Sequence, residues 1–155
     1  MIEPSYSPWG SVDHCRMLCY GAFEVQTARH GGVMILCQLA DEYLSKEAQK
    51  VGFVEGQYLC FEEDCDSAVA IRELLDKGLT QAPVNQYYKD GEYSANIDRV
   101  VATWHQDYLQ AVNNRMAAEQ RKMAEDAALD GRVLCHEAEV ESVKIESVFC
   151  PEQRD

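Results

Sequence analysis

The sequence contains no run of roughly eighteen uncharged apolar residues, which is the length that a helix needs to cross a bilayer. Its first ten residues lack the basic and then apolar order of a secretory signal. There is no G-x-x-x-x-G-K-[ST] loop and no G-x-G-x-x-G turn, so the common phosphate-binding motifs are absent. We therefore expect a cytoplasmic protein without a membrane span, and we expect no cofactor.

Basic residues are scarce, since 14 lysines and arginines stand against 27 aspartates and glutamates, with a formal net charge of -13. The acidic excess lies in residues 1–93 and 119–155, whereas residues 94–118 are balanced. Such a field repels nucleic acid and anionic membrane surfaces, and it attracts basic protein grooves. The charge therefore predicts a basic protein partner, with no direct binding to nucleic acid or to a membrane.

Cysteine, by contrast, is plentiful, with 7 residues at irregular spacing. An odd number without a secretory signal argues against a disulfide framework and favours buried, reduced thiols. Structural zinc sites usually present two close pairs such as C-x2-C, and the pairs here are spaced more widely. An alternative interpretation is a metal site formed by Cys15, Cys19, Cys60 and Cys65.

Hydrophobic periodicity predicts an α+β fold with a small, mainly antiparallel sheet, two short helices and one long C-terminal helix. Apolar and polar residues alternate over 22–27, and an apolar run follows at 33–37, so the chain begins with a β-meander. We expect short helices over 41–52 and 68–77, and a strand between them at 58–61. Residues 1–80 would then form the core of a single domain that spans 1–155.

An apolar stripe at helical spacing predicts one long helix over 94–130 that begins at Ser94. At 1.5 Å per residue such a helix exceeds the width of a small domain, so its second half would project or pair with a partner. A homodimer through this helix, acting as an adaptor, is therefore an alternative interpretation. Val143 and Ile145 alternate with charged residues, which predicts a final strand within 132–150.

The stretch CFEEDCD, residues 60–66, places four carboxylates where a strand gives way to a helix. Asp64 is the expected N-cap, and the other acids lie near the positive end of the helix dipole, so helix initiation explains most of the cluster. An alternative is a metal-assisted or acid/base hydrolase centred on His30 and Glu62–Asp66, with His30, Glu62 and Glu63 as catalytic residues.

Three short motifs occur in the order SPWG at 7–10, TARHGG at 27–32 and FEEDCDSAV at 61–69. Together they resemble an uncharacterised domain family of phages, plasmids and conjugative transposons, which has Pro-Trp-Gly, His-Gly-Gly and Glu-Glu-Asp-Cys motifs. The resemblance implies a gene carried by a mobile genetic element. Small acidic proteins of such elements are often anti-defence factors, which inhibit restriction enzymes or CRISPR nucleases.

We therefore expect a non-enzymatic anti-defence protein that binds and inhibits a nucleic-acid-processing host enzyme, with a CRISPR nuclease as the favoured target. Closely spaced carboxylates would act as a DNA mimic and enter a cationic groove in competition with phosphates. Tyrosines of the loop before the long helix would add contacts. The predicted contact residues are Glu62, Glu63, Asp64, Asp66, Tyr87, Tyr88, Glu119, Glu125 and Asp126.

Overall fold

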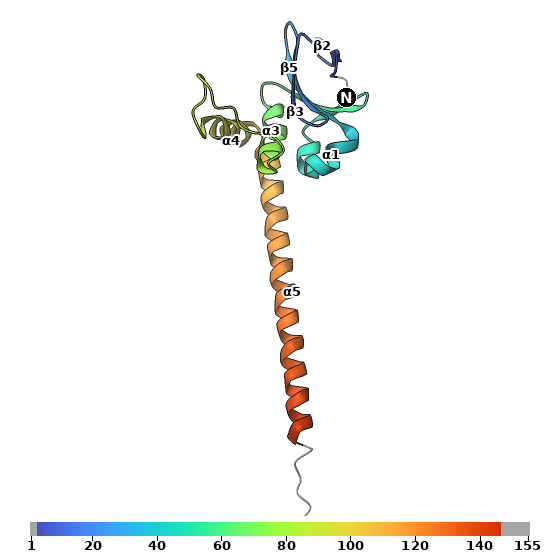
Figure 1. Ribbon diagram of the computed structural model, residues 1–155, viewed down its shortest axis with the longest axis vertical. Coiled ribbons are helices and arrows are strands. Elements are labelled where there is room, and N and C mark those ends of the chain that lie inside the picture. The colour runs from blue at the N-terminus through green and yellow to red at the C-terminus, as the bar shows by residue number, and fades with distance from the viewer. Residues whose placement is uncertain (1–2, 147–155) are drawn as a thin grey trace, which may run out of the picture. The chain divides into compact units, whose positions relative to one another are not determined.

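The computed structural model describes the backbone of residues 3–146 and the side chains of residues 3–128. A five-stranded antiparallel sheet in the order β3-β4-β5-β7-β6 lies in the N-terminal half of the chain (Figure 1), and a two-stranded ladder, β1-β2, precedes it in the sequence. The strands are β1 Tyr6–Ser7, β2 Gly10–Ser11, β3 His14–Cys19, β4 Ala22–Gln26, β5 Gly31–Leu36, β6 Phe53–Glu55 and β7 Tyr58–Glu62.

The two faces of the sheet enter separate apolar clusters, because successive side chains of a strand point to opposite sides. On β5, Val33 and Ile35 belong to the larger cluster, whereas Met34 belongs to the smaller one. Side chains from the helices complete the larger cluster. Trp9, from the N-terminal ladder, packs against the smaller one. The predicted meander is therefore confirmed, with β7 placed beside β5.

Within the described residues, five helices accompany the sheet. α1 and α3 pack against the strands β5 and β7, and α4 packs against α3. In the same part of the chain, no helix has the length and apolar character needed to cross a membrane. This arrangement confirms the predicted α+β class. The helices are α1 Cys37–Tyr43, α2 Lys46–Gln49, α3 Asp66–Asp76, α4 Glu92–Trp104 and α5 Gln106–Glu146.

A buried carboxylate, that of Glu73 on α3, ties several elements of the core together. Glu73 is 8% exposed and accepts hydrogen bonds from both the backbone N–H and the hydroxyl of Ser45. The Tyr108 hydroxyl donates a further hydrogen bond of 2.9 Å, and burial together with the Glu73 carboxylate raises the pKa of Tyr108. Because a buried charge needs hydrogen-bond partners, Glu73 fixes α2, α3 and the start of α5 against one another.

Ser45 also explains why the single helix predicted over 41–52 is wrong. Its hydroxyl accepts a hydrogen bond from the Ala48 N–H, so a new helix, α2, begins here. The preceding helix, α1, starts at Cys37 and ends at Tyr43.

The prediction of one uninterrupted helix over 94–130 is also wrong, because His105 separates α4 from α5. α4 begins after Gly91, which has a φ of 79°, rather than at Ser94. No glycine or proline lies between residues 92 and 130, so the sequence carries none of the usual signals for this break.

The strand predicted within 132–150 is corrected by the course of α5, which continues through Glu146. Each residue added to an existing helix gains a backbone hydrogen bond, whereas a short isolated strand leaves its backbone groups unpaired. The brief alternation around Val143 therefore did not decide the backbone conformation. The last part of the predicted strand, 147–150, lies outside the described residues.

Contacts divide the chain into two compact units, Met1–Val112 and Asn113–Asp155. The first unit contains the sheet, α1 to α4 and the start of α5. In the second unit, the described side chains of residues 113–128 are exposed except for that of Ala117, which is half-buried. The single-domain organisation over 1–155 stays a prediction.

Candidate functional site

Three segments that are distant in sequence meet at one end of the sheet. Trp9 lies over Gly32 so closely that a Cβ atom on Gly32 would be 2.4 Å from Trp9 Cη2. The Thr27 hydroxyl donates a 2.7 Å hydrogen bond to the His30 carbonyl and lies 3.4 Å from the Trp9 carbonyl. We call the assembly of Trp9, residues 27–32 and residues 62–63 the motif corner.

The third segment joins the corner through the β5-β7 pairing, in which Gly32 is opposite Glu62. The Glu63 N–H donates a 3.1 Å hydrogen bond to the Gly31 carbonyl. A Cβ atom on Gly31 would lie 2.5 Å from the Val25 carbonyl oxygen, so this position also requires glycine. Both glycines of the HGG motif are therefore explained by close approach of neighbouring chain segments.

Besides the exposed guanidinium of Arg29, the ionisable groups of the corner are an imidazole and two carboxylates. His30 Nδ1 lies 4.0 Å from Glu62 Oε1 and 3.9 Å from Glu63 Oε1. One ligand atom from each of these residues lies within 4.8 Å of the other two. Their side chains are 59%, 31% and 40% exposed, respectively. The corner can therefore present negative charge to a partner or bind a cation.

The junction between β7 and α3 differs from the predicted capping arrangement. The N-cap of α3 is Cys65, whose side chain makes no capping hydrogen bond, so the prediction of Asp64 as N-cap is wrong. The Asp64 N–H instead donates a 3.2 Å hydrogen bond to Glu62 Oε2. Asp66 lies in the first turn of α3, where the helix dipole favours a carboxylate.

A second group of chemically active side chains forms beside this junction. Asp66 Oδ1 lies 3.4 Å from Cys65 Sγ and 3.4 Å from His105 Nε2. Burial, and then the hydrogen bond to the Asp66 carboxylate, raise the pKa of the Cys65 thiol. Sequence reasoning did not select His105 as a member of this group. No spacing pattern links it to Cys65 and Asp66, because the fold alone brings the α4-α5 joint to the start of α3.

The family described as Domain of unknown function (DUF7007) matches residues 2–132. The chain belongs to the DUF7007 family. This match confirms the expectation of an uncharacterised family, and it extends well past the three motifs into α5. Searches of the curated proteins and of the solved structures found no match.

The four cysteines predicted as an alternative metal site of the DUF7007 chain do not form one site. Cys15 and Cys60 belong to the smaller apolar cluster, whereas Cys19 packs against the larger one. The reason is an irregularity in the β3-β4 register between Met17 and Cys19, which changes the face that the strand presents. Burial raises the pKa of Cys60 to about 12, so this thiol behaves as a core residue. Cys65 lies apart, at the start of α3.

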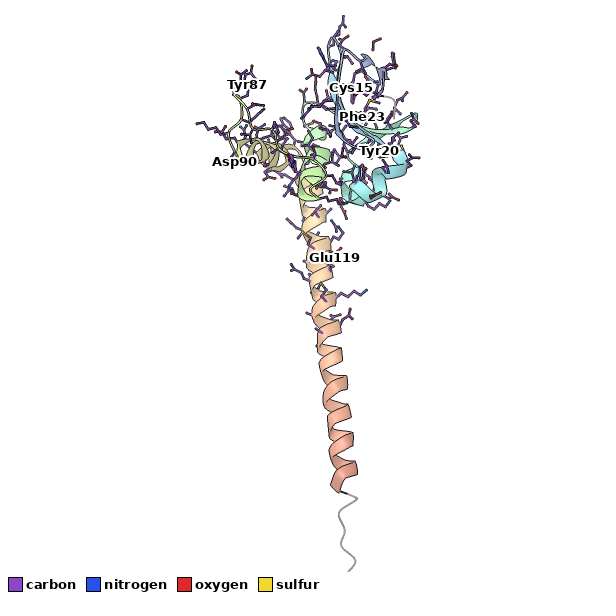
Figure 2. All side chains as sticks on the ribbon, viewed as in Figure 1. Cys15, Tyr20, Phe23, Tyr87, Asp90 and Glu119 are labelled. Atoms are coloured by element: carbon purple, nitrogen blue, oxygen red, sulfur yellow. The ribbon has the colours of Figure 1, made fainter. Side chains whose placement is uncertain are left out.

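The predicted aromatic contacts of the DUF7007 chain differ from each other in exposure. Tyr87, on the segment before α4, is 77% exposed (Figure 2). The Tyr88 ring instead packs edge-on against the Tyr93 ring, with centroids 5.1 Å apart. Tyr87 is therefore the better placed of the two to touch a partner.

The three predicted contact residues on α5 are all exposed. Arg115 Nη1 lies 3.2 Å from Glu119 Oε1 (Glu119 is labelled in Figure 2), so this carboxylate is partly neutralised. No ion pair to an arginine or lysine is found for Glu125 or Asp126 among the described residues.

Proposed function

We propose that this DUF7007 protein is a non-enzymatic anti-defence protein of a mobile genetic element, which binds and inhibits a nucleic-acid-processing host enzyme in the cytoplasm. The observation that carries the proposal is the pair of carboxylates at the motif corner. Ligand oxygens of Glu62 and Glu63 lie within 4.8 Å of each other. No arginine or lysine of the described residues pairs with either one. Arg29 also belongs to the corner but forms no ion pair with either glutamate, so two carboxylates stand against one guanidinium and an excess of negative charge remains.

Ion pairing narrows the surface that is suited to this role. Asp66 Oδ1 lies 3.4 Å from His105 Nε2, closer than the 3.9–4.0 Å between His30 and the two glutamates of the corner, so this carboxylate is the less available to a partner. Glu119 is partly neutralised by its contact with an arginine. Among the predicted acidic contacts of the first unit, Glu62, Glu63 and Asp64 remain as the surface that we propose.

The proposed mechanism is competition for a cationic groove. A groove that holds a phosphate backbone carries positive potential, and carboxylates on a rigid corner can occupy it in place of phosphates. An exposed ion pair contributes about 0.2–1 kcal/mol, so two carboxylates supply at most about 2 kcal/mol of the binding free energy. The remainder must come from other contacts, for which the exposed Tyr87 is a candidate. A CRISPR nuclease is the favoured target because of the motif resemblance to mobile-element proteins.

The test is inhibition of DNA cleavage by guide-loaded CRISPR nucleases, with restriction enzymes as a second panel. The double variant Glu62→Gln/Glu63→Gln keeps the side-chain shapes and removes both charges. We expect it to inhibit about tenfold more weakly, since two ion pairs are lost. Inhibition by the unaltered protein should also weaken as salt rises from about 50 to 200 mM.

A matched control separates the corner from net charge. Glu42 and Asp90 have exposed side chains and lie outside the motif corner (Asp90 is labelled in Figure 2). The variant Glu42→Gln/Asp90→Asn changes the formal charge by the same amount and should retain full potency. Equal loss in both double variants, or potency that does not respond to salt, would contradict the proposed mechanism.

A second candidate function, a metal-assisted hydrolase, is favoured by one specific observation. His30, Glu62 and Glu63 place one imidazole nitrogen and two carboxylate oxygens within 4.8 Å of one another on an exposed corner. Imidazole and carboxylate together suit divalent ions such as Mn²⁺ or Zn²⁺, and an open site leaves coordination positions for water and substrate.

The variant His30→Ala distinguishes the two candidates. Loss of the imidazole should abolish metal-dependent hydrolysis of a chromogenic phosphodiester if the corner is a hydrolase. It leaves both carboxylates in place, so inhibition of a nuclease should persist if the corner is a binding surface. Retained hydrolysis by the variant would exclude His30 as a catalytic residue.

A further inference from the structure

The group formed by Cys65, Asp66 and His105 carries an inference that does not rest on the proposed function. All three residues belong to the first compact unit. Cys65 and Asp66 form the start of α3, and His105 is the joint between α4 and α5. Their ligand atoms lie within 4.8 Å of one another. We call this group the junction cluster.

The imidazole of His105 is the first sign of a ligand. Its side chain is 12% exposed, and its Nε2 atom is buried without a hydrogen-bond partner among the described residues. Asp66 Oδ1 lies 3.4 Å away, but the contact does not have hydrogen-bond geometry. Buried polar atoms in native proteins are nearly always satisfied, so an unsatisfied imidazole nitrogen facing a carboxylate calls for a further group.

The backbone at His105 is the second sign. Its φ of -124° and ψ of 48° are not helical, and they separate two helices in a stretch without glycine or proline. A break of this kind normally has a local breaker or an inserted side chain as its cause. Here the side chain of the breaking residue lies against Asp66. The chain therefore interrupts a favourable helix at the residue that supplies the imidazole.

Two of the three ligand distances within the junction cluster match those around a tetrahedral zinc ion, and the third, between Cys65 and His105, is within 4.8 Å. Zinc bonds of about 2.0–2.1 Å to nitrogen and oxygen and about 2.3 Å to sulfur put nitrogen and oxygen ligands about 3.3 Å apart. The same bonds put sulfur and oxygen ligands about 3.6 Å apart. The observed separations are 3.4 Å from Asp66 Oδ1 to His105 Nε2 and 3.4 Å from Asp66 Oδ1 to Cys65 Sγ. Both observed separations agree with the expected zinc–ligand geometry within a few tenths of an ångström. These ligand atoms would therefore need to move little to bind the ion.

The chemical nature of the ligands selects the class of ion. Thiolate and imidazole suit zinc and related transition metals, whereas calcium and magnesium prefer ligand sets made only of oxygen. We infer that Cys65, Asp66 and His105 bind one divalent transition-metal ion of the zinc class, through three protein ligands. Zinc usually has four ligands, so at least one position is left for water or another group. The bound ion would fasten the α4-α5 joint to the start of α3.

The test is metal binding by the full chain, reduced and freed of metal by a chelator. Zn²⁺ affinity is measured by competition with a chromophoric chelator, and Co²⁺ serves as a spectroscopic probe because its charge-transfer absorption reports a thiolate ligand. We expect one ion per chain, with a thiolate-to-cobalt band. Cys65→Ser should remove that band, and Asp66→Asn and His105→Gln should each weaken Zn²⁺ binding at least tenfold.

Two control variants locate the ion. His30→Ala removes a ligand from the motif corner, and Cys37→Ser removes an exposed thiol that is outside both groups. Both variants should keep the affinity and the band. Circular dichroism checks that each variant is folded. If His105→Gln does not fold, Cys65→Ser, which exchanges a single atom, still tests the proposed site. The inference is overturned if the unaltered chain binds no Zn²⁺, if the band survives Cys65→Ser, or if His30→Ala weakens binding as much as His105→Gln.

Discussion

Replacing Gly32 by alanine tests whether the motif corner depends on direct contact between its segments. A Cβ atom on Gly32 would lie 2.1 Å from the Phe61 carbonyl oxygen and 2.4 Å from Trp9 Cη2, whereas real Cβ contacts essentially never fall below 3.0 Å. The Phe61 oxygen belongs to the backbone of β7, which pairs with β5 on either side of this point. The two strands must therefore separate by about 1 Å, because a close-packed interior leaves no spare room.

The expected loss of stability follows from three contributions. Overpacking costs about 1–3 kcal/mol, and a weakened hydrogen bond of the ladder adds about 1 kcal/mol. Alanine also reduces the conformational entropy of the unfolded chain, which offsets about 0.4–1 kcal/mol of this destabilisation. We expect Gly32→Ala to lower the free energy of unfolding by about 2–3 kcal/mol, and the Tm by roughly 10 °C. Urea unfolding followed by near-ultraviolet circular dichroism measures the change, because all the tyrosines and tryptophans lie within Met1–Val112.

Two further variants make the test specific. Gly56 has a φ of 57° and nothing within 4 Å of a built Cβ atom, so Gly56→Ala should cost only the backbone strain, about 1 kcal/mol. Trp9→Ala removes one of the two close contacts of Gly32, so Gly32→Ala should cost less in that background without becoming neutral. A change below about 0.5 kcal/mol for Gly32→Ala, or an equal cost with and without Trp9, would refute the packing described for the corner.

Further predictions concern the buried core of the first unit. Tyr108→Phe removes a hydrogen bond to the Glu73 carboxylate and should lower the free energy of unfolding by about 1.5–2 kcal/mol in urea at neutral pH; an unchanged midpoint would contradict the buried network. In the folded chain the pKa of Tyr108 is raised above its ordinary value of 10.0. Tyr108 therefore contributes its full share to the free energy of unfolding below pH 10, and this stabilisation is lost as the pH rises further. Tyr108→Phe should therefore flatten the alkaline part of the stability curve, and a curve as steep as that of the unaltered protein would speak against this. Ser45→Ala removes a helix cap and a hydrogen-bond donor to Glu73, so it should lower the free energy of unfolding by about 2 kcal/mol in the same urea assay. A loss no larger than that of an ordinary surface substitution would be inconsistent with the network. In thiol labelling of the native protein, the exposed Cys37 should react quickly. Cys60 should not, since it is buried and its pKa is raised to about 12. Early modification of Cys60, detected by peptide mapping, would disprove its burial.

Much of the sheet was predictable because its strands have a clear pattern. Residues 22–27 and 33–37 show the alternation and the apolar run expected of a half-buried and a central strand, and the structure places β4 and β5 there. β6, at Phe53–Glu55, was not predicted, because three residues are too few to show a period. Its place at the sheet edge follows from pairing with β7, which the local sequence does not reveal.

The two groups at the β7-α3 junction were predictable to different degrees. His30, Glu62 and Glu63 lie in short motifs with unusual residue types, so they could be selected from sequence and the fold brings them together. His105 has no such signal, since it lies within a stretch of regular helical periodicity and its partners are far away in the chain. Helical periodicity predicted a continuous helix there, and tertiary contact overrode it.

The order of the strands implies an order of assembly. β5 meets β4 through residues 27–30, so this hairpin needs only a short loop to close. α1, α2 and β6 lie between β5 and β7 in the sequence, and we expect such a distant pairing to form more slowly than a local one. We therefore expect His30 to be positioned by the hairpin before Glu62 and Glu63 are brought to it. A nascent chain that has emerged only as far as β5 contains the hairpin and His30, but it contains neither Glu62 nor Glu63.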